Sequence, residues 1–318
     1  NPMKLKFNLK SLAVALMIAA APLPMTAYAA PGNLSIVQKS FAAPEEAGKA
    51  LADAVRAKDV EALLAVVGPK SRSWLFSGDK VADREAWDKF LLAYERKNSI
   101  SQGADGRAML MVGDGDWSFP APLVKKDGSW IFDSAAGREE IINRRVGENE
   151  LSAIQTLLAT VDAQREYAAA DLDGNGYNDY ARRFISSAGA KDGLYWPATA
   201  NQPLSPLGPL VGEAAREGYR HKGGQGKEPQ PYHGYNFRML TAQGVNAPGG
   251  AYSYLVNDRM IGGFAVVAYP AKYGVSGVMT FVVNHDGTVY QKNLGKNTKI
   301  EALRMRRFNP DSSWNEAK

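Results

Sequence analysis

The chain has 318 residues, of which 45% are hydrophobic and 22% are charged, so it can form two ordinary domains with buried cores. It contains no cysteine, which excludes disulfide bonds, thiolate catalysis, cysteine-based metal sites and a lipid-modified cysteine anchor. The formal net charge is +5, but residues 1–29 carry three lysines and no acidic residue, so the rest of the chain is nearly neutral. That balance gives no electrostatic reason to expect nucleic acid or an anionic membrane as a partner.

Residues 1–29 are interpreted as an expression remnant, Asn1-Pro2, followed by a secretory signal peptide. Three lysines precede an apolar run over residues 12–21, and Ala27-Tyr28-Ala29 supplies the small residues that a signal peptidase requires. The run is shorter than the roughly 20 apolar residues of a spanning helix, and no later segment approaches that length. We therefore expect cleavage near Ala29, a periplasmic mature protein and no membrane insertion once the leader is removed.

Residues 41–146 are predicted to form a first α+β domain, after a flexible lead-in over residues 30–40. Apolar residues at helical spacing and cap residues predict its helices, and Asp127-Gly128 predicts a hairpin turn. The expected elements are a helix over 44–58, a short helix capped by Asp59, a helix over 84–94, a strand over 109–112 and a hairpin joining 122–124 to 130–132.

Residues 147–318 are predicted to form a second α+β domain. Asn149 is expected to cap a helix over 150–170, whose apolar stripe consists of Leu151, Ile154, Leu158 and Val161. Four later segments have strand patterns separated by turn residues, which favours sequential antiparallel strands. They span residues 235–240, 263–269, 278–283 and 288–290.

Two local patterns resemble known folds. The segments PEEAGKALADAVRAKDVEALLAVV and LVKKDGSWIFD resemble the nuclear-transport-factor-like cone, which implies a helix packed on a curved antiparallel sheet around a pocket. The segments GYNFRMLTA, GGFAVVAYPAKYGVSGVMTFVVN and HDGTVYQ resemble the globular head of type IV pilins and pseudopilins, in which a long helix packs on an antiparallel sheet. Pilins carry an apolar assembly helix directly ahead of the head, whereas a whole domain precedes it here.

Most of the chain also resembles one family of bacterial exported proteins. The resemblance covers residues 41–314 and rests on segments that include VADREAWDKFLLAY, GREEIINRRVGENELSAIQT and VDAQREYAAADLDGNGYNDYARRFIS. These segments are similar to the proteins collected as domain of unknown function 2950. The resemblance implies an envelope protein of Gram-negative bacteria, and it implies no activity and no catalytic residue.

The strongest chemical motif is an oxygen-rich loop with the spacing of a calcium-binding EF-hand. Its candidate metal ligands are, in loop order, Asp171, Asp173, Asn175, the carbonyl of Tyr177, and Asp179. Position twelve holds Arg182, where the EF-hand has a bidentate Glu, so a calcium site would need another ligand such as Asp192 or water. The alternative interpretation is an Asx-rich turn, because Asp, Asn and Gly also favour turns for local reasons.

The sequence contains none of the familiar catalytic motifs. The histidines, His221, His233 and His285, show no zinc-binding spacing, and no nucleophile elbow, phosphate loop or dinucleotide fingerprint occurs. His233 is the first candidate for an acid–base role, because the pKa of an unperturbed histidine lies nearest neutrality.

The sequence therefore favours a non-enzymatic, soluble periplasmic protein that serves as a binding or assembly module for an envelope protein or polymer, with calcium as the candidate cofactor of the loop over residues 171–179. One alternative is a periplasmic enzyme that acts on an envelope polymer through the N-terminal pocket. Another is a structural, pilin-like subunit. The expected fold class is α+β, with a helix-on-curved-sheet cone followed by a long helix packed on an antiparallel sheet.

Overall fold

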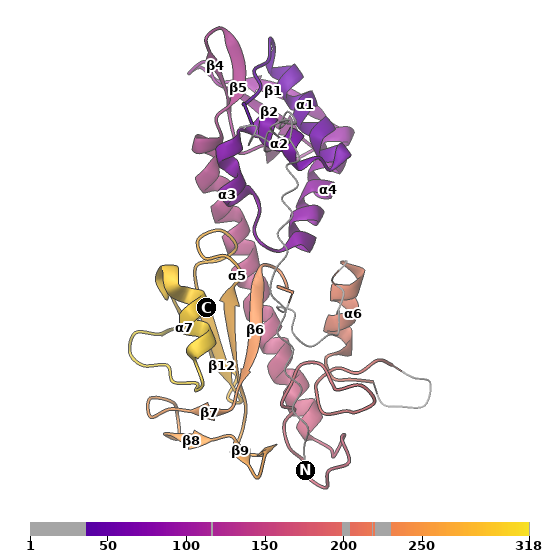
Figure 1. The fold of residues 1–318 in the computed structure, drawn as a ribbon, viewed down its shortest axis with the longest axis vertical. Helices are drawn as coiled ribbons and strands as arrows, with labels where there is room; N and C mark the ends of the chain where they lie inside the picture. Colours follow the sequence, from indigo (N-terminus) through magenta and orange to yellow (C-terminus); the bar gives the residue numbers. More distant parts are fainter. Residues whose placement is uncertain (1–35, 116, 199–203, 218, 220–229, 318) are drawn as a thin grey trace, which may run out of the picture. The chain divides into compact units, whose positions relative to one another are not determined.

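The computed structural model describes residues 36–317, except 116, 199–203, 218 and 220–229 (Figure 1). The expected signal peptide, residues 30–35 of the lead-in and His221 lie outside the described residues. Within the described part of the chain, the fold is α+β, with seven α-helices and several antiparallel sheets. The expected fold class is confirmed, because helices on an antiparallel sheet come first and a long helix with a second antiparallel sheet follows.

The N-terminal region packs short helices on a five-stranded antiparallel sheet. Its helices are α1 (Pro44–Ala57), α2 (Val60–Val67), α3 (Arg72–Leu75) and α4 (Lys80–Arg96), with a 3₁₀ turn, η1 (Pro69–Ser71). Its strands are β1 (Asn98–Gln102), β2 (Ala108–Val112), β3 (Trp117–Ser118), β4 (Leu123–Lys126) and β5 (Ser129–Phe132). They follow the order β1-β2-β4-β5, and β3 also pairs with β2.

Local signals explain most of these boundaries. The Asp59 carboxylate accepts hydrogen bonds from the backbone of Glu61 and Ala62, so the expected cap of α2 is confirmed. Asp127 and Gly128 both have positive φ, +50° and +80°, as a two-residue hairpin turn requires. Strand β1 was not expected, because four of its five residues are polar and exposed and only Ile100 packs inward.

The long helix α5 (Ser134–Ala168) contains 35 residues and begins at the Asp133 cap. The expectation that Asn149 caps a new helix is wrong, because Asn149 lies inside α5 and its side-chain amide donates to the Ser276 carbonyl at 2.8 Å. No proline interrupts this segment, and a helix tolerates a single glycine such as Gly147 at about 1 kcal/mol. The expected domain boundary between residues 146 and 147 falls within α5. That residues 41–146 and 147–318 unfold independently stays a prediction.

The buried faces of α5 differ from the expected apolar stripe. Val161 is buried and Ile154 packs against the same core, but Leu151 and Leu158 are 61% and 42% exposed. Leu157, which was not in the stripe, is fully buried. The single-stripe prediction failed because α5 contacts the core on more than one side: Leu157 joins the C-terminal sheet, whereas Tyr167 joins a separate cluster with Leu194 and Trp196.

The C-terminal sheet confirms the expected antiparallel meander. Its strands are β6 (Tyr235–Leu240), β11 (Ala265–Pro270), β12 (Thr280–Asn284), β13 (Val289–Lys292) and β14 (Asn315–Glu316), in the order β14-β13-β12-β11-β6. Between β6 and β11 the chain forms four short strands, β7 (Ala242–Gln243), β8 (Tyr252–Ser253), β9 (Leu255–Val256) and β10 (Arg259–Met260). The remaining helical segments are α6 (Gly208–Arg216), η2 (Gly295–Asn297) and α7 (Thr298–Arg304).

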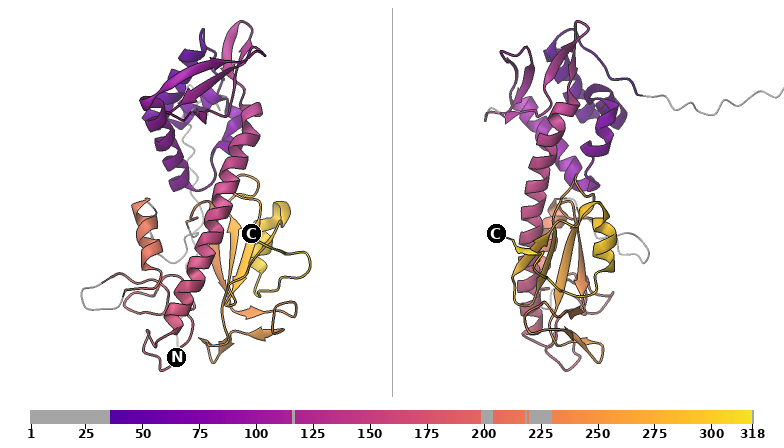
Figure 2. Two further views of the ribbon diagram at one scale, coloured as in Figure 1. Left: turned by 180° about the vertical axis from the view of Figure 1, so that it is seen from behind. Right: turned by 90° about the vertical axis from the view of Figure 1, so that its left-hand side faces the viewer.

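Helices cover this sheet on both faces. Helix α5 contacts β11, β12 and β13, and α7 contacts β11 from the opposite face (Figure 2). Every residue of β11 and β12 is therefore buried, which explains why β11 and the centre of β12, residues 281–283, are apolar on both faces instead of alternating. None of the helices in the described part of the chain combines the length and apolar character needed to cross a bilayer.

Candidate functional site

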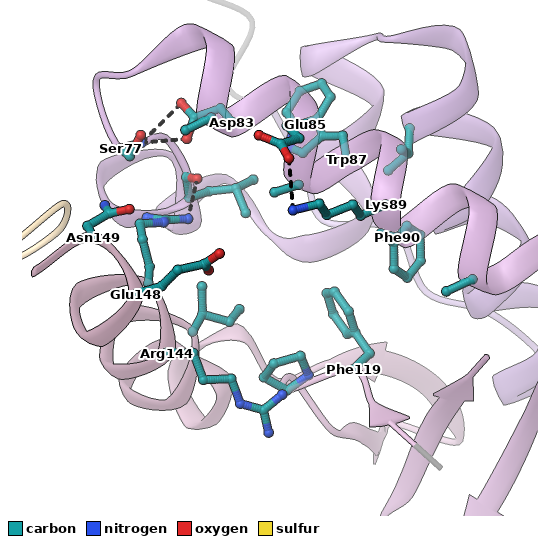
Figure 3. Close-up of a pocket in the computed structure, with 18 of the residues that line it drawn as sticks. Ser77, Asp83, Glu85, Trp87, Lys89, Phe90, Phe119, Arg144, Glu148 and Asn149 are labelled. Atoms are coloured by element: carbon teal, nitrogen blue, oxygen red, sulfur yellow. Dashed lines mark hydrogen bonds and ion pairs between the residues drawn. The ribbon is translucent and has the colours of Figure 1, made fainter. Parts of the chain in front are cut away.

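A cavity of about 710 Å³ lies in the N-terminal region, between its helices and its sheet (Figure 3). Its volume is within the range of pockets that bind small molecules, about 300–1,000 Å³. Its walls are mainly apolar and include Leu51, Val55, Leu63, Phe90, Val112 and Phe119. The arrangement can therefore bury an apolar group of a ligand.

Helix α4 leaves this space unfilled. It has no fully buried residue, and Trp87 and Phe90 are only half-buried against the N-terminal core. Edge-to-face contacts fix the aromatic walls, with ring centroids 5.8 Å apart for Phe90 and Phe119 and 5.5 Å apart for Phe119 and Phe132. The wall shape is thus held by contacts within the protein.

Charged side chains surround the opening of the cavity. Lys89 on α4 pairs with Glu85 at 2.8 Å, and Arg144 on α5 pairs with Glu140 at 2.5 Å. The hydrogen bond that Lys89 donates to Glu85 raises the pKa of Lys89, and the negative charge of Glu148 acts in the same direction. Glu148 lies on α5, and its carboxylate points into the open space of the cavity (Figure 3).

Arg145 and Asp83 have structural roles beside the opening. The Arg145 guanidinium donates to the carbonyls of Trp74 and Leu75 at 2.8 and 3.0 Å, and the Asp83 carboxylate accepts from the Ser77 backbone N–H at 3.1 Å. Burial raises the pKa of Asp83 and lowers the pKa of Arg145, and the attraction between the two charges opposes both shifts. Both groups fix the segment between α3 and α4.

His233 and Glu217 also line the cavity, and the distance between His233 Nε2 and Glu217 Oε2 is 3.2 Å. The imidazole ring lies 4.2 Å from the Tyr232 ring and 5.8 Å from the Tyr219 ring, measured between centroids. The sequence indicates His233 but not Glu217, because the two residues are 16 positions apart and no local pattern joins them. The other described histidine, His285, packs against Tyr254 in the expected turn after β12.

A buried carboxylate connects this part of the cavity wall to α4. Asp79 Oδ1 caps α4 by accepting from the backbone of Val81 and Ala82. Asp79 Oδ2 accepts from the Tyr219 hydroxyl at 2.8 Å and from the Gly234 N–H at 2.9 Å. Asp79 therefore joins segments 140 and 155 residues away to the start of α4.

The expected calcium loop is organised around backbone and amide donors. Asp171 accepts hydrogen bonds from the N–H groups of Asn175 and Gly176, both at 2.9 Å, and these bonds lower the pKa of its carboxyl group. The Asn175 side-chain amide donates to Asp173 at 3.0 Å and to Asp179 at 3.1 Å. Burial and the nearby Asp179 raise the pKa of Asp173.

Arg182 and Asp192, which neighbour the loop, both interact with residues outside it. Arg182 is turned toward Asp258, with 3.0 Å between Arg182 Nη1 and Asp258 Oδ2, so its charge is held by a carboxylate outside the loop. Asp192 lines the same open cleft as Asp171 and Asp173, but its oxygens accept from the backbone and hydroxyl of Ser187. Tyr177 is exposed, and the Arg259 guanidinium lies over its ring, 3.9 Å from the centroid.

The loop has therefore adopted the geometry of hydrogen-bonded Asx turns. Among the residues that the structure describes, no group of three or more His, Cys, Asp or Glu side chains is placed to hold a metal ion. Calcium binding would require Asp173 and Asp179 to exchange the Asn175 amide for the cation. The loop is otherwise anchored, because the Gln164 side chain forms two 2.8 Å hydrogen bonds with the Ala181 backbone.

Comparisons with known proteins provide a family and no activity. No curated protein and no solved structure matches the chain. One family model, described as protein of unknown function (DUF2950), matches residues 38–317 and so covers both the N-terminal region with its cavity and the C-terminal sheet. The chain belongs to this family.

Proposed function

We propose that this protein is a non-enzymatic binding module of the cell envelope, and that its cavity holds the apolar part of an envelope protein or polymer. The observation that carries the proposal is the 710 Å³ cavity with apolar walls in the N-terminal region. The space is bounded by aromatic rings that already contact each other, so binding requires little reordering of side chains.

A neutral apolar fluorophore tests the binding proposal directly. N-phenyl-1-naphthylamine should become brighter with the protein, because the cavity removes the probe from water. Ala86→Trp should reduce the fluorescence increase, since Ala86 lines the cavity and the indole would occupy part of it. Arg84→Trp is the matched control, because it places the same ring on α4 at an exposed position outside the cavity lining. Equal binding by both variants would contradict the proposal.

We propose that the protein acts in the periplasm of Gram-negative bacteria after its leader is removed. The support is the lysine-rich start, the short apolar run and the Ala27-Tyr28-Ala29 site in the sequence. Protein isolated from its native host should have an N-terminus at or near Ala30 by mass spectrometry. Recovery of the intact leader in the cytoplasm would contradict export.

We infer two finer fold relationships from the element order. The helices of the N-terminal region and its antiparallel sheet support a nuclear-transport-factor-like cone, and α5 with the meander β11-β12-β13 supports a pilin-head-like arrangement. A pilin-like structural role would require self-assembly. Light scattering after size exclusion should therefore show a concentration-dependent mass if the protein is a structural subunit, and a constant mass if it is a binding module.

We propose that calcium stabilises the loop over residues 171–179. The support is the alternation of ligand oxygens along the sequence and the lining of one cleft by Asp171, Asp173 and Asp192. Weak binding is expected, because the residue at position twelve is Arg182 and supplies no oxygen.

A second candidate function is an enzyme that acts on an envelope polymer. The specific observation in its favour is the pair formed by His233 and Glu217 in the cavity wall, which has the partners of a general base and its orienting carboxylate. Purified cell-wall polymer incubated with the protein should then release soluble fragments, and His233→Ala should abolish the release. Naphthylamine binding without any fragment release would favour the binding module.

A further inference from the structure

The cations at the opening of the cavity already have partners within the protein. Lys89 pairs with Glu85 at 2.8 Å, and Arg144 pairs with Glu140 at 2.5 Å. Arg145 donates to two backbone carbonyls of the segment that precedes α4. An anionic ligand would have to compete with these groups for each cation.

Glu148 differs from these residues. It forms no hydrogen bond or ion pair with any residue that the structure describes, yet it lines the cavity and points into it (Figure 3). Glu217 provides a second negative group in the same lining, and its Oε2 is buried without a hydrogen-bond donor although His233 Nε2 lies at 3.2 Å. Glu148 therefore has unused bonding capacity at the cavity lining.

The position of Glu148 makes this capacity relevant to a ligand. Glu148 is exposed at the opening, so it is accessible to a ligand's charge, and its attraction for a cation is sensitive to salt. A charge-assisted hydrogen bond from an ammonium group to a carboxylate is stronger than a hydrogen bond between neutral groups. An apolar chain in the cavity would place a terminal group at this opening.

We propose that the cavity selects ligands that carry a protonated amine on an apolar chain, with the amine bound by Glu148. This inference rests on the proposed binding function of the same cavity. It identifies the ligand class as cationic amphiphiles, and it assigns Glu148 as the residue that determines the preference for the head group.

Three probes with the same chain and different heads test the inference on the full-length protein. Octylammonium, octanoate and octanol are titrated calorimetrically at pH 7 and low salt. Octylammonium should bind about tenfold more tightly than octanoate, and the preference should weaken as salt is raised. Glu148→Gln should remove most of the preference, whereas Glu139→Gln should retain it, because Glu139 lies on the same helix outside the cavity lining.

The outcomes separate this inference from the binding proposal. If octanol binds but octylammonium binds no more tightly than octanoate, the head-group preference is wrong and the apolar pocket stands. If Glu148→Gln melts like the unaltered protein and keeps the full preference, Glu148 is not the contact. If none of the three probes binds, the binding function itself fails.

Discussion

Helix α4 of the N-terminal region and the central strands of the C-terminal sheet differ in how completely they bury apolar side chains. Every residue of β11 and β12 is buried between α5 and α7 (Figure 2). In contrast, α4 buries no residue completely, and its aromatic side chains line a 710 Å³ cavity. Close packing stabilises a fold because apolar area is removed from water and dispersion contacts are made, and a cavity forgoes part of both contributions.

The difference indicates that stability and ligand binding depend on different parts of the chain. The C-terminal sheet provides a filled core that supports the long helix α5, and α5 in turn presents Arg144 and Glu148 at the opening of the cavity. We therefore expect substitutions in the sheet to affect stability most, and substitutions around the cavity to affect binding most.

The same substitution at two phenylalanines gives the largest expected difference. Phe281→Ala in β12 should destabilise the protein by about 3–5 kcal/mol, because the side chain is fully buried and leaves a cavity. Phe90→Ala should lower the free energy of unfolding by only about 1 kcal/mol, since this ring is half-buried and already faces open space. Urea denaturation measures both. Equal losses would show that the cavity wall is packed as tightly as the sheet.

Asp79 tests the connection between α4 and the segment that carries His233. Asp79→Ala should lower the free energy of unfolding by about 2–4 kcal/mol, because it removes a helix cap and leaves the Tyr219 hydroxyl and the Gly234 N–H without their acceptor. Asp59→Ala is the matched control, and it should lose only about 1 kcal/mol because Asp59 acts as a cap alone. Similar losses in the two variants would mean that the connection contributes nothing.

Calcium binding is expected to change the free energy of unfolding by a smaller amount, through a loop that belongs to neither of the two regions compared above. With a Kd of about 0.1–1 mM, 10 mM calcium should raise the free energy of unfolding by about 1.4–2.7 kcal/mol. Asp173→Ala should abolish the rise in Tm, whereas Asp162→Ala, an exposed change on α5, should retain it. A scanning calorimetry experiment without any calcium-dependent shift in the unaltered protein would leave the Asx-turn interpretation standing.

Adjacent leucines on α5 include the variant with the smallest expected change, Leu158→Ala, and together they test the orientation of that helix. Leu158→Ala should change stability by no more than about 0.5 kcal/mol, because Leu158 is partly exposed and contributes to neither buried cluster. Leu157→Ala should lower it by about 2–5 kcal/mol, because Leu157 is fully buried against the C-terminal sheet. Thermal denaturation of the two variants compares them, and a reversed order would show that α5 is rotated about its axis.

The sequence alone determined the features that depend on neighbouring residues. The Asp59 cap, the Asp127-Gly128 hairpin and the main strands of the C-terminal sheet follow from short-range signals, because a cap or a turn is satisfied by groups within a few positions. The loop over residues 171–179 was found in the same way, since its spacing is visible without any fold.

The tertiary structure decided the features that depend on distant segments. Helix α5 continues through Asn149, and its buried face shifts to Leu157, because the surrounding segments determine which sides of a helix are covered. Likewise, the pairing of His233 with Glu217 depends on the tertiary fold. The cavity also depends on it, because an unfilled volume results from how helices and sheet meet, and no local pattern of residues specifies it.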